Sequence, residues 1–222
     1  MRAVSRAQSE TRKYTPLDRL VGVFDRLLRT TVSSGQTAIR ESPAVGQRDS
    51  PLSARDRRHS AGLMRVNHTG EVCAQALYLG QALVARDEQL KVFLLDAATE
   101  EQDHLAWCAQ RLDELESRSS LLNPLWFAGS VGIGLVAATV SDAASLGFVE
   151  ETERQVCAHL DGHLTELSSN DLRSRAIVAT MRDEEERHAI NANSYGAEEL
   201  PPSIKSLMRL QARVMTVLAY WF

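Results

Sequence analysis

The sequence predicts an all-α fold in which four long helices pack as a bundle. Apolar residues occupy 44% of the 222 positions and aromatic residues only 5%, which suits helices packed on helices better than a β-sandwich. Two distant segments carry the same Glu-x-x-His pattern, at Glu101–His104 and again at Glu185–His188. Because positions i and i+3 share one face of a helix, each segment can direct a carboxylate and an imidazole at one point.

Size and charge limit what the protein could be. A chain of 222 residues fits one domain with a sizeable core. We divide it into an N-terminal segment, residues 1–60, and a helical domain, residues 61–222. The formal net charge of -4 creates no global basic field, so we expect no nucleic-acid partner.

The cysteines and the N-terminus bear on the compartment. Cys73, Cys108 and Cys157 are isolated and show no Cys-x-x-Cys spacing, which argues against a disulfide framework and a zinc site. We therefore expect a reducing compartment. The N-terminus has no apolar signal core, so secretion has no support. A mitochondrial presequence stays open, since residues 1–13 hold several arginines and a single acid, Glu10.

The N-terminal segment is expected to hold one amphipathic helix followed by irregular chain. Between residues 14 and 32, leucine, valine and phenylalanine recur at helical spacing. Residues 33–60 are rich in serine, glycine, proline and arginine and show no sustained period. We interpret them as a linker that precedes the helical domain.

The first helix of the domain, from Gly62 to about Arg86, has an unusual character. Between Arg65 and Arg86 its only formal charge is Glu71, so we expect the helix to be buried nearly all round. A buried ionised carboxylate is costly unless it is paired or bound to a metal. The alternative is that Glu71 lies near a helix N-terminus and is stabilised by the helix dipole. This segment alone leaves both interpretations open.

Three further helices complete the predicted bundle. They cover roughly residues 87–117, 124–167 and 171–194. The run from Leu121 to Ser141 contains no charge and is long enough to suggest a membrane span. Glycine, serine and threonine dilute its hydrophobicity, and the same helix is predicted to continue beyond it. We therefore expect a buried helix with one apolar end that touches lipid.

A last amphipathic helix, residues 203–222, follows a double proline. It places Lys205, Arg209 and Arg213 at i, i+4 spacing and ends in Tyr-Trp-Phe. A basic amphipathic helix with terminal aromatic residues suits a membrane interface. The alternative is a helix docked on the bundle with its charges in water.

A further glutamate precedes each Glu-x-x-His segment at nearly the same distance. Glu71 lies 30 positions before Glu101, and Glu153 lies 32 positions before Glu185. The midpoint of each interval falls at a predicted turn, and residues equidistant from the turn of an antiparallel hairpin lie level with each other. Two such hairpins would bring four carboxylates and two imidazoles together. The predicted metal ligands are Glu71, Glu101, His104, Glu153, Glu185 and His188.

Such a cluster needs counter-charge, because like charges a few ångströms apart force protonation. Two metal ions would supply it. Oxygen-rich ligands with two histidines fit iron or manganese better than zinc, which favours tetrahedral sites with fewer carboxylates.

Several neighbouring residues compete with or support these ligands. Glu150 is the alternative to Glu153 as the third-helix ligand. The acids beside the other ligands are expected to face solvent, namely Glu100, Glu184 and Glu186. Candidates to orient the metal-bound imidazoles are Asp103, Asp183 and Arg182. Histidines without a matching partner in the pattern are His68, His159 and His163.

Three stretches resemble the demethoxyubiquinone hydroxylase family of ubiquinone biosynthesis, a ferritin-like di-iron group. They are residues 65–72 (Arg-Val-Asn-His-Thr-Gly-Glu-Val), 101–105 and 182–188, and the likeness runs from about Leu63 to the C-terminus. Residues 14–20 also look like the N-terminus of longer bacterial members. The resemblance implies the same six ligands, with Glu101 and Glu185 bridging two iron ions.

By this resemblance the protein would be a membrane-associated monooxygenase. It would use two iron ions and O2 to hydroxylate the ring of 2-polyprenyl-3-methyl-6-methoxy-1,4-benzoquinol (demethoxyubiquinol), one step before the final O-methylation. The expected partners are this quinol, a membrane surface and other ubiquinone-biosynthesis proteins. The expected location is peripheral, on the cytoplasmic side of the cell membrane.

The same ligands would also serve other proteins. One rival hypothesis is a ferritin-like iron-storage or ferroxidase protein, which would form a large soluble shell. A second is a di-iron peroxidase or oxidase that acts on peroxide or a small soluble molecule. A third is a membrane-associated helical scaffold that binds no metal.

Overall fold

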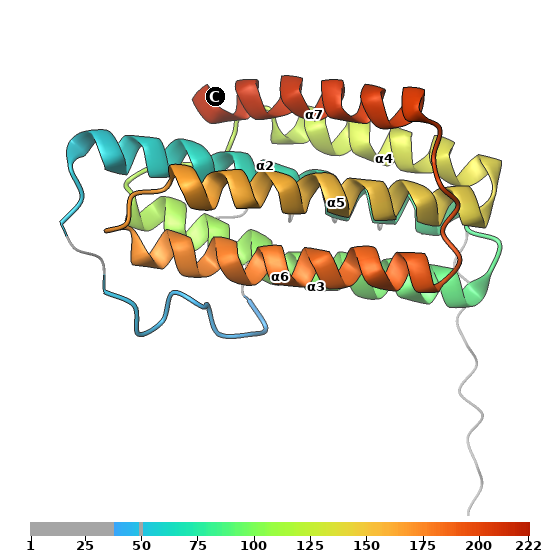
Figure 1. Cartoon of the computed structure of the whole chain (residues 1–222), viewed down its shortest axis with the longest axis horizontal. Helices are drawn as coiled ribbons and strands as arrows, with labels where there is room; N and C mark the ends of the chain where they lie inside the picture. Colours follow the sequence, from blue (N-terminus) through green and yellow to red (C-terminus); the bar gives the residue numbers. More distant parts are fainter. Residues whose placement is uncertain (1–37, 49–50) are drawn as a thin grey trace, which may run out of the picture.

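The computed structural model describes residues 38–48 and 51–222, and the helix predicted at 14–32 lies outside them. Six helices and no strand occur in the described residues (Figure 1). The helices are α2 Ala54–Val84, α3 Glu88–Glu114, α4 Asn123–Val140, α5 Asp142–Glu166, α6 Leu172–Ser194 and α7 Pro202–Trp221. The all-α prediction is confirmed.

Four of these helices form the bundle. A short turn joins α2 to α3, another joins α5 to α6, and the two members of each hairpin pack closely on each other. In Figure 1, α2 and α5 form one layer and α3 and α6 the other, while α4 and α7 cover the α2/α5 layer. The chain passes from the first hairpin to the second through α4. One long crossover between two hairpins is the connectivity of ferritin-like bundles.

The prediction of one continuous helix over residues 124–167 is wrong. The chain breaks at Ser141, whose backbone is extended (φ −163°, ψ 164°) and whose side chain accepts a hydrogen bond from the backbone N–H of Ala144. The next residue, Asp142, accepts hydrogen bonds from the N–H groups of Arg86 and Asp87 in the α2–α3 turn. Ser141 is therefore the N-cap of a new helix, and it lets the chain turn from α4 into the bundle.

The first bundle helix begins earlier than predicted, at Ala54 instead of about Gly62. The side chain of Ser53 accepts a hydrogen bond from the backbone N–H of Asp56. This N-cap satisfies one of the free N–H groups that open a helix. The domain boundary predicted at residue 60 consequently falls inside α2.

Helix α4 lies outside the bundle, which corrects the expectation of a buried helix with one apolar end. Only 28% of α4 is buried. Among the described residues it is the one helix that length and composition would allow to cross a membrane. It approaches α2 so closely that a Cβ atom on Gly134 would overlap the carbonyl oxygen of Leu77, and one on Gly80 would overlap that of Val131.

Helix α7 forms ion pairs through two of its three regularly spaced basic residues, Lys205 and Arg209. The ammonium group of Lys205 lies 3.5 Å from the carboxylate of Glu151 on α5 and 3.3 Å from that of Glu199. Arg209 approaches Glu151 at 3.8 Å. Two of these three basic residues therefore pair with carboxylates beside α7, whereas the docked alternative placed the charges of this helix in water. The exposed face of α7 is instead apolar, with Leu207, Leu210, Val214, Val217, Trp221 and Phe222.

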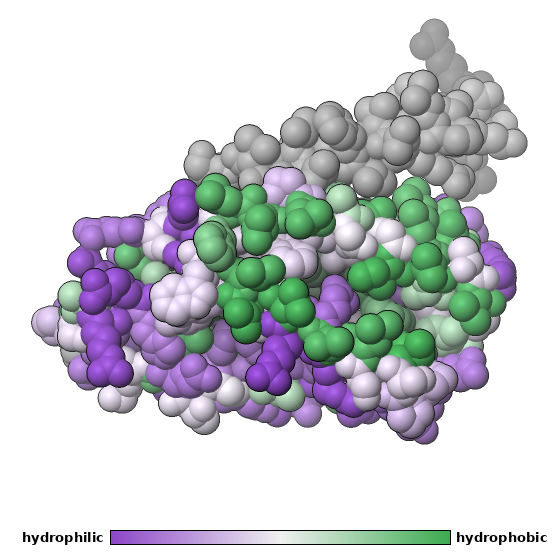
Figure 2. All heavy atoms as spheres, turned by 90° about the horizontal axis from the view of Figure 1, so that it is seen from above, coloured by the Kyte–Doolittle hydropathy of each residue, from purple (hydrophilic) through white to green (hydrophobic). Residues whose placement is uncertain are grey.

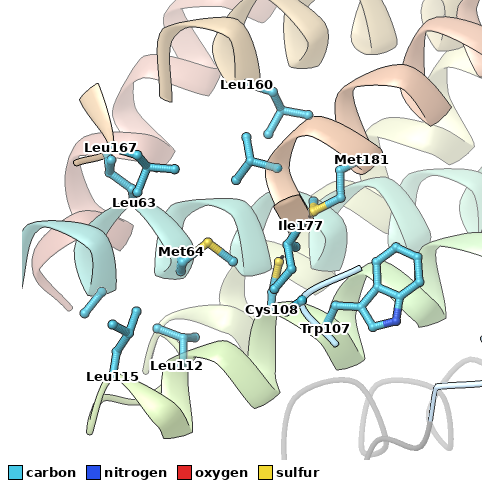
Figure 3. Packing of buried hydrophobic residues seen from close by; sticks show 13 residues of the cluster. Leu63, Met64, Trp107, Cys108, Leu112, Leu115, Leu160, Leu167, Ile177 and Met181 are labelled. Atoms are coloured by element: carbon cyan, nitrogen blue, oxygen red, sulfur yellow. Dashed lines mark hydrogen bonds between the residues drawn. The ribbon is translucent and has the colours of Figure 1, made fainter. Parts of the chain in front are cut away.

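Two apolar clusters fill the bundle on either side of its middle. At one end, side chains of α2, α3, α5 and α6 pack around Met64, Cys108 and Met181 (Figure 3). At the other end, Tyr78 and Leu94 belong to a second cluster and are fully buried. The clusters leave between them a belt of buried carboxylates and histidines.

Candidate metal centre

The structure brings the six predicted ligands together between the two apolar clusters. All six are buried, and they come from four helices: Glu71 from α2, Glu101 and His104 from α3, Glu153 from α5, and Glu185 and His188 from α6. Their ligand atoms form two groups in which all atoms lie within 4.8 Å of one another. One group contains Glu71, Glu101, His104 and Glu185, and the other contains Glu153, Glu185 and His188.

Each imidazole directs its Nδ1 atom at the carboxylates. Nδ1 of His104 lies 3.1 Å from Oε2 of Glu101 and 3.1 Å from Oε1 of Glu185. Nδ1 of His188 lies 3.4 Å from Oε1 of Glu101 and 3.1 Å from Oε2 of Glu185. Both glutamates thus turn one oxygen toward each histidine. A carboxylate that bridges two ions needs this arrangement.

The remaining two glutamates complete the centre at its ends. Glu71 lies 3.3 Å from Nδ1 of His104 and belongs to that histidine's group only. Glu153 belongs to the group of His188 only. The four carboxylates therefore divide into two shared and two terminal positions, one terminal carboxylate for each histidine.

Burial makes this cluster costly without cations. Burial and the neighbouring Glu101 raise the pKa of Glu71 well above its usual value, and burial and Glu185 do the same to the pKa of Glu153. Neither oxygen of Glu153 receives a hydrogen bond from a described residue. Buried polar atoms are rarely left unpartnered. The donor set of oxygens and two nitrogens fits two iron or manganese ions.

A second pair of carboxylates holds the outer nitrogens of the histidines. Nε2 of His104 lies 2.8 Å from Oε2 of Glu184, and Nε2 of His188 lies 2.8 Å from Oε2 of Glu100. The prediction that Glu184 faces solvent is wrong, because it is buried. The prediction holds only in part for Glu100, whose side chain is 49% exposed. Each contact crosses between α3 and α6, so it ties the two hairpins together.

The sequence contains a signal for these outer carboxylates. In both halves the motif is Glu-Glu-x-x-His, since Glu100 precedes Glu101 and Glu184 precedes Glu185. Spacing within one helix relates a histidine only to the glutamate three positions before it, and a contact from one helix to another has no such spacing. Burial alone would raise the pKa of Glu184, but hydrogen bonds from His104 and Arg40 outweigh it and lower this pKa to about 2.

The three residues predicted to orient the imidazoles contact other groups. Asp103 accepts hydrogen bonds from Arg40 instead of a histidine. Arg182 pairs with Asp161 on α5, and Asp183 is exposed beside Arg182. Direct orientation by these three residues was a wrong prediction, because their side chains leave the helix away from the imidazoles.

The other competing residues lie outside the two metal groups. Glu150 pairs with Arg154, its neighbour one turn along α5, and Glu186, which is exposed as predicted, pairs with Arg182. The rings of His159 and His163 pack edge to face on each other with their centroids 4.0 Å apart. The remaining histidine of this set, the buried His68, lies 3.3 Å from the side-chain amide of Asn123.

An apolar cavity of about 480 Å³ reaches the centre from the side of α4 and α7. Glu71 forms part of its wall. Its apolar lining includes Val66, Leu77, Ile133, Phe148, Val156 and Met208. The cavity has no signal in the sequence, because its wall combines short pieces of four helices whose packing no local pattern encodes.

Comparisons with known proteins assign the family. The model of the family described as "Ubiquinone biosynthesis protein COQ7" matches residues 58–219. The chain belongs to the COQ7 family. Its curated relatives include proteins named 3-demethoxyubiquinol 3-hydroxylase. The one from Ralstonia pickettii is 56% identical, with 92% of this chain and 99% of the relative covered. The one from Xanthomonas campestris is 55% identical, with 96% and 97% covered.

A solved structure supports the fold of this COQ7-family chain. The bacterioferritin-related protein of Bacteroides fragilis, a dodecameric thioferritin, matches with a TM-score of 0.50 and 17% sequence identity. The match covers 70% of this chain and 89% of that protein. The ferritin-like prediction is confirmed. At this identity the likeness concerns the fold alone.

Proposed function

We propose that this chain is an O2-dependent di-iron monooxygenase that hydroxylates the ring of demethoxyubiquinol. The observation that carries the proposal is the apolar cavity that ends at Glu71, beside the buried carboxylate and histidine cluster. Its volume of about 480 Å³ lies within the usual range for small-molecule sites. The name of the relatives, 3-demethoxyubiquinol 3-hydroxylase, supports the same reaction.

The residues of the centre have distinct roles in this proposal. Glu101 and Glu185, which each lie near both histidines, would be shared by the two iron ions, while Glu71 with His104 and Glu153 with His188 would hold one ion each. When bound, the iron ions would supply the electrons that activate O2. The apolar cavity wall would keep water from the reacting ring and hold that ring against the face of the centre that carries Glu71.

The exposed face of α4 and α7 suits a substrate with a long isoprenoid tail. Figure 2, seen from above the layer of α4 and α7, shows apolar side chains gathered over a large part of this face. The residues from α4 include Leu125, Val136 and Val140. Both helices also line the cavity. A tail could therefore extend from the cavity into a lipid surface while the ring stays inside.

The decisive test measures the product. Iron-loaded protein is reduced anaerobically in the presence of a demethoxyubiquinol analogue and then exposed to O2. The expected result is a product heavier by one oxygen atom, which carries the label when 18O2 is used. An unchanged analogue, in protein that retains two iron ions per chain, would refute the proposed reaction.

The same protein preparation separates the rival hypotheses. Iron storage predicts a large shell that mineralises many iron ions per chain, so size measurement and iron content test it directly. A peroxidase would consume peroxide without O2. Our proposal instead places the protein on a membrane, where we expect it on the cytoplasmic side and in contact with other ubiquinone-biosynthesis proteins. Membrane fractionation and cross-linking test these two expectations.

A further inference from the structure

A short segment before the bundle reaches the outer shell of the metal centre. We call residues 38–48 the strap; it is the blue trace beside α3 and α6 in Figure 1. The guanidinium group of Arg40 donates two hydrogen bonds to Glu184, of 2.6 and 2.9 Å. Its Nε donates a third, of 2.6 Å, to Asp103. The family match begins at residue 58, so Arg40 lies outside the matched segment.

The strap is anchored independently of Glu184. The backbone N–H of Ile39 donates to Asp103 at 2.6 Å. The guanidinium carbon of Arg40 lies 4.9 Å from the ring centre of Trp107, whose indole N–H donates to the carbonyl oxygen of Arg40. Ala44 is buried in the apolar core. Asp103 and Trp107 thus orient the planar guanidinium group without help from Glu184. The group binds Glu184 through two parallel hydrogen bonds, a geometry that lysine cannot reproduce.

Glu184 passes this constraint to a metal ligand. Its Oε2 atom accepts both a hydrogen bond from Arg40 and the contact from Nε2 of His104. The opposite nitrogen of His104 faces the metal centre. A metal-bound imidazole depends on the partner of its other nitrogen for its orientation, and loss of that partner typically weakens metal binding by about 10- to 100-fold.

No segment among the described residues holds the other half of the centre in the same way. Glu100, the partner of His188, is 49% exposed, against 11% for Glu184. No lysine or arginine among the described residues forms an ion pair with Glu100. It borders an open groove of about 490 Å³ between α3 and α6, which also includes Asp96 and Tyr195. Water can therefore compete for Glu100, but it reaches Glu184 much less.

We propose that Arg40 is a positioning residue of the metal centre, which holds Glu184 against His104 and so makes the His104 half bind its metal more tightly than the His188 half. The proposal rests on the metal centre of the proposed function. It does not depend on the identity of the substrate.

The test is a titration of the metal-free full-length protein with Co2+, in which calorimetry and the absorption of bound cobalt report each binding step. Wild-type protein should bind two ions in two steps of different affinity, and His104→Ala should remove the tighter step. Arg40→Ala should weaken the tighter step by about 10-fold and leave the weaker step unchanged. Arg40→Lys should have an intermediate effect. Glu100→Gln should weaken the second step only.

Two matched variants separate positioning from charge. Arg187 also approaches Glu184, at 3.4 Å, but through a single contact from an exposed side chain. Arg187→Ala removes the same charge and should change the tighter step much less than Arg40→Ala. Arg48, at the exposed end of the strap, should tolerate replacement by alanine without effect on either step.

Three outcomes would overturn the proposal. Equal weakening of both steps by Arg40→Ala would mean a general structural role. Equal effects of Arg40→Ala and Arg187→Ala would mean that only charge matters, and no effect of Arg40→Ala would remove the role altogether. Failure of the wild-type protein to bind two ions would instead refute the metal centre itself. Circular dichroism and thermal unfolding establish that each variant is folded.

Discussion

Glu153 combines complete burial with an absence of hydrogen-bond donors from the described residues. In a metal-free protein, its carboxyl group must either take up a proton or remain as a buried charge that accepts no hydrogen bond from a described residue. Both alternatives cost free energy. The residue therefore stabilises the fold only when a cation is bound, and it links metal binding to stability.

We expect Glu153→Gln to raise the free energy of unfolding of the metal-free protein by roughly 1–2 kcal/mol, because it removes the buried carboxylate. The melting temperature should rise accordingly. The same change should lower the affinity for metal. Thermal unfolding with a chelator and with added Mn2+ measures both effects. Glu150→Gln is the control, since Glu150 pairs with Arg154 at the surface. A lower melting temperature of metal-free Glu153→Gln would contradict this account.

His163 should make the stability depend on pH independently of the metal. Burial lowers its pKa from 6.5 to about 3. Between these values the unfolded chain binds a proton that the folded chain does not, so the free energy of unfolding falls as pH falls below 6.5. The loss at pH 5 is about 2 kcal/mol, from about 1.4 kcal/mol per pKa unit.

His163→Leu should therefore reduce the slope of stability against pH between about pH 6.5 and pH 5 by close to one proton. Denaturant unfolding of the metal-free protein at several pH values gives the slope. An unaltered slope in His163→Leu would show that this imidazole titrates normally.

At the scale of elements, the contact of α4 with α2 positions the part of the cavity wall that α4 forms. The two helix backbones approach closely at Gly80 and Gly134, where side chains would collide with carbonyl oxygens. Carbonyl groups in a helix cannot move aside as a flexible side chain can. The small residues therefore set the distance between α2 and α4, and with it the shape of the cavity that both helices line.

We expect Gly134→Ala to destabilise the protein by about 1–3 kcal/mol, because the added methyl group overlaps the backbone of α2. Gly132→Ala lies on the same helix with nothing within 4 Å of the added atom. It should be neutral or stabilise by up to about 1 kcal/mol, since alanine favours helix. Urea unfolding of both variants measures the difference. Equal stabilities would mean that α4 shifts freely on α2.

At the scale of the whole molecule, the metal centre lies between two different surfaces. The α4/α7 side is apolar and opens into the cavity (Figure 2). The α3/α6 side carries the outer carboxylates, the strap and an open groove with acidic residues. Substrate from a lipid surface and ions from water would thus approach from opposite sides. This arrangement underlies the proposed membrane association.

Val217→Glu, on the exposed face of α7, should weaken binding to phospholipid vesicles on the order of 10-fold, because it removes one apolar anchor and adds a charge. Vesicle flotation measures the bound fraction. Val92→Glu is a matched control, because Val92 is 55% exposed on α3 and Val217 is 56% exposed. Equal losses for both variants would argue against a membrane-binding face at α7. Metal content should be unaffected in both.

The sequence by itself determined the helices and the candidate ligands. Helical periodicity and caps such as Asp87 and Asp171 are local, so the bounds of α3 and α6 could be predicted within a few residues, whereas the start of α2 and the end of α4 were not. The doubled Glu-x-x-His spacing brings residues level across each hairpin, a consequence of regular helix geometry. The break at Ser141 was also encoded locally, but the long apolar run around it obscured the cap.

Only the tertiary structure decided which groups meet across helices. The contact of Glu184 with His104, the bond from Arg40 to Glu184 and the cavity wall all join residues from separate elements. Such contacts depend on the rotation and spacing of whole helices, which side-chain volume and close backbone approach set. A one-dimensional pattern records which side chains share a face. It does not record which face of another helix they will meet.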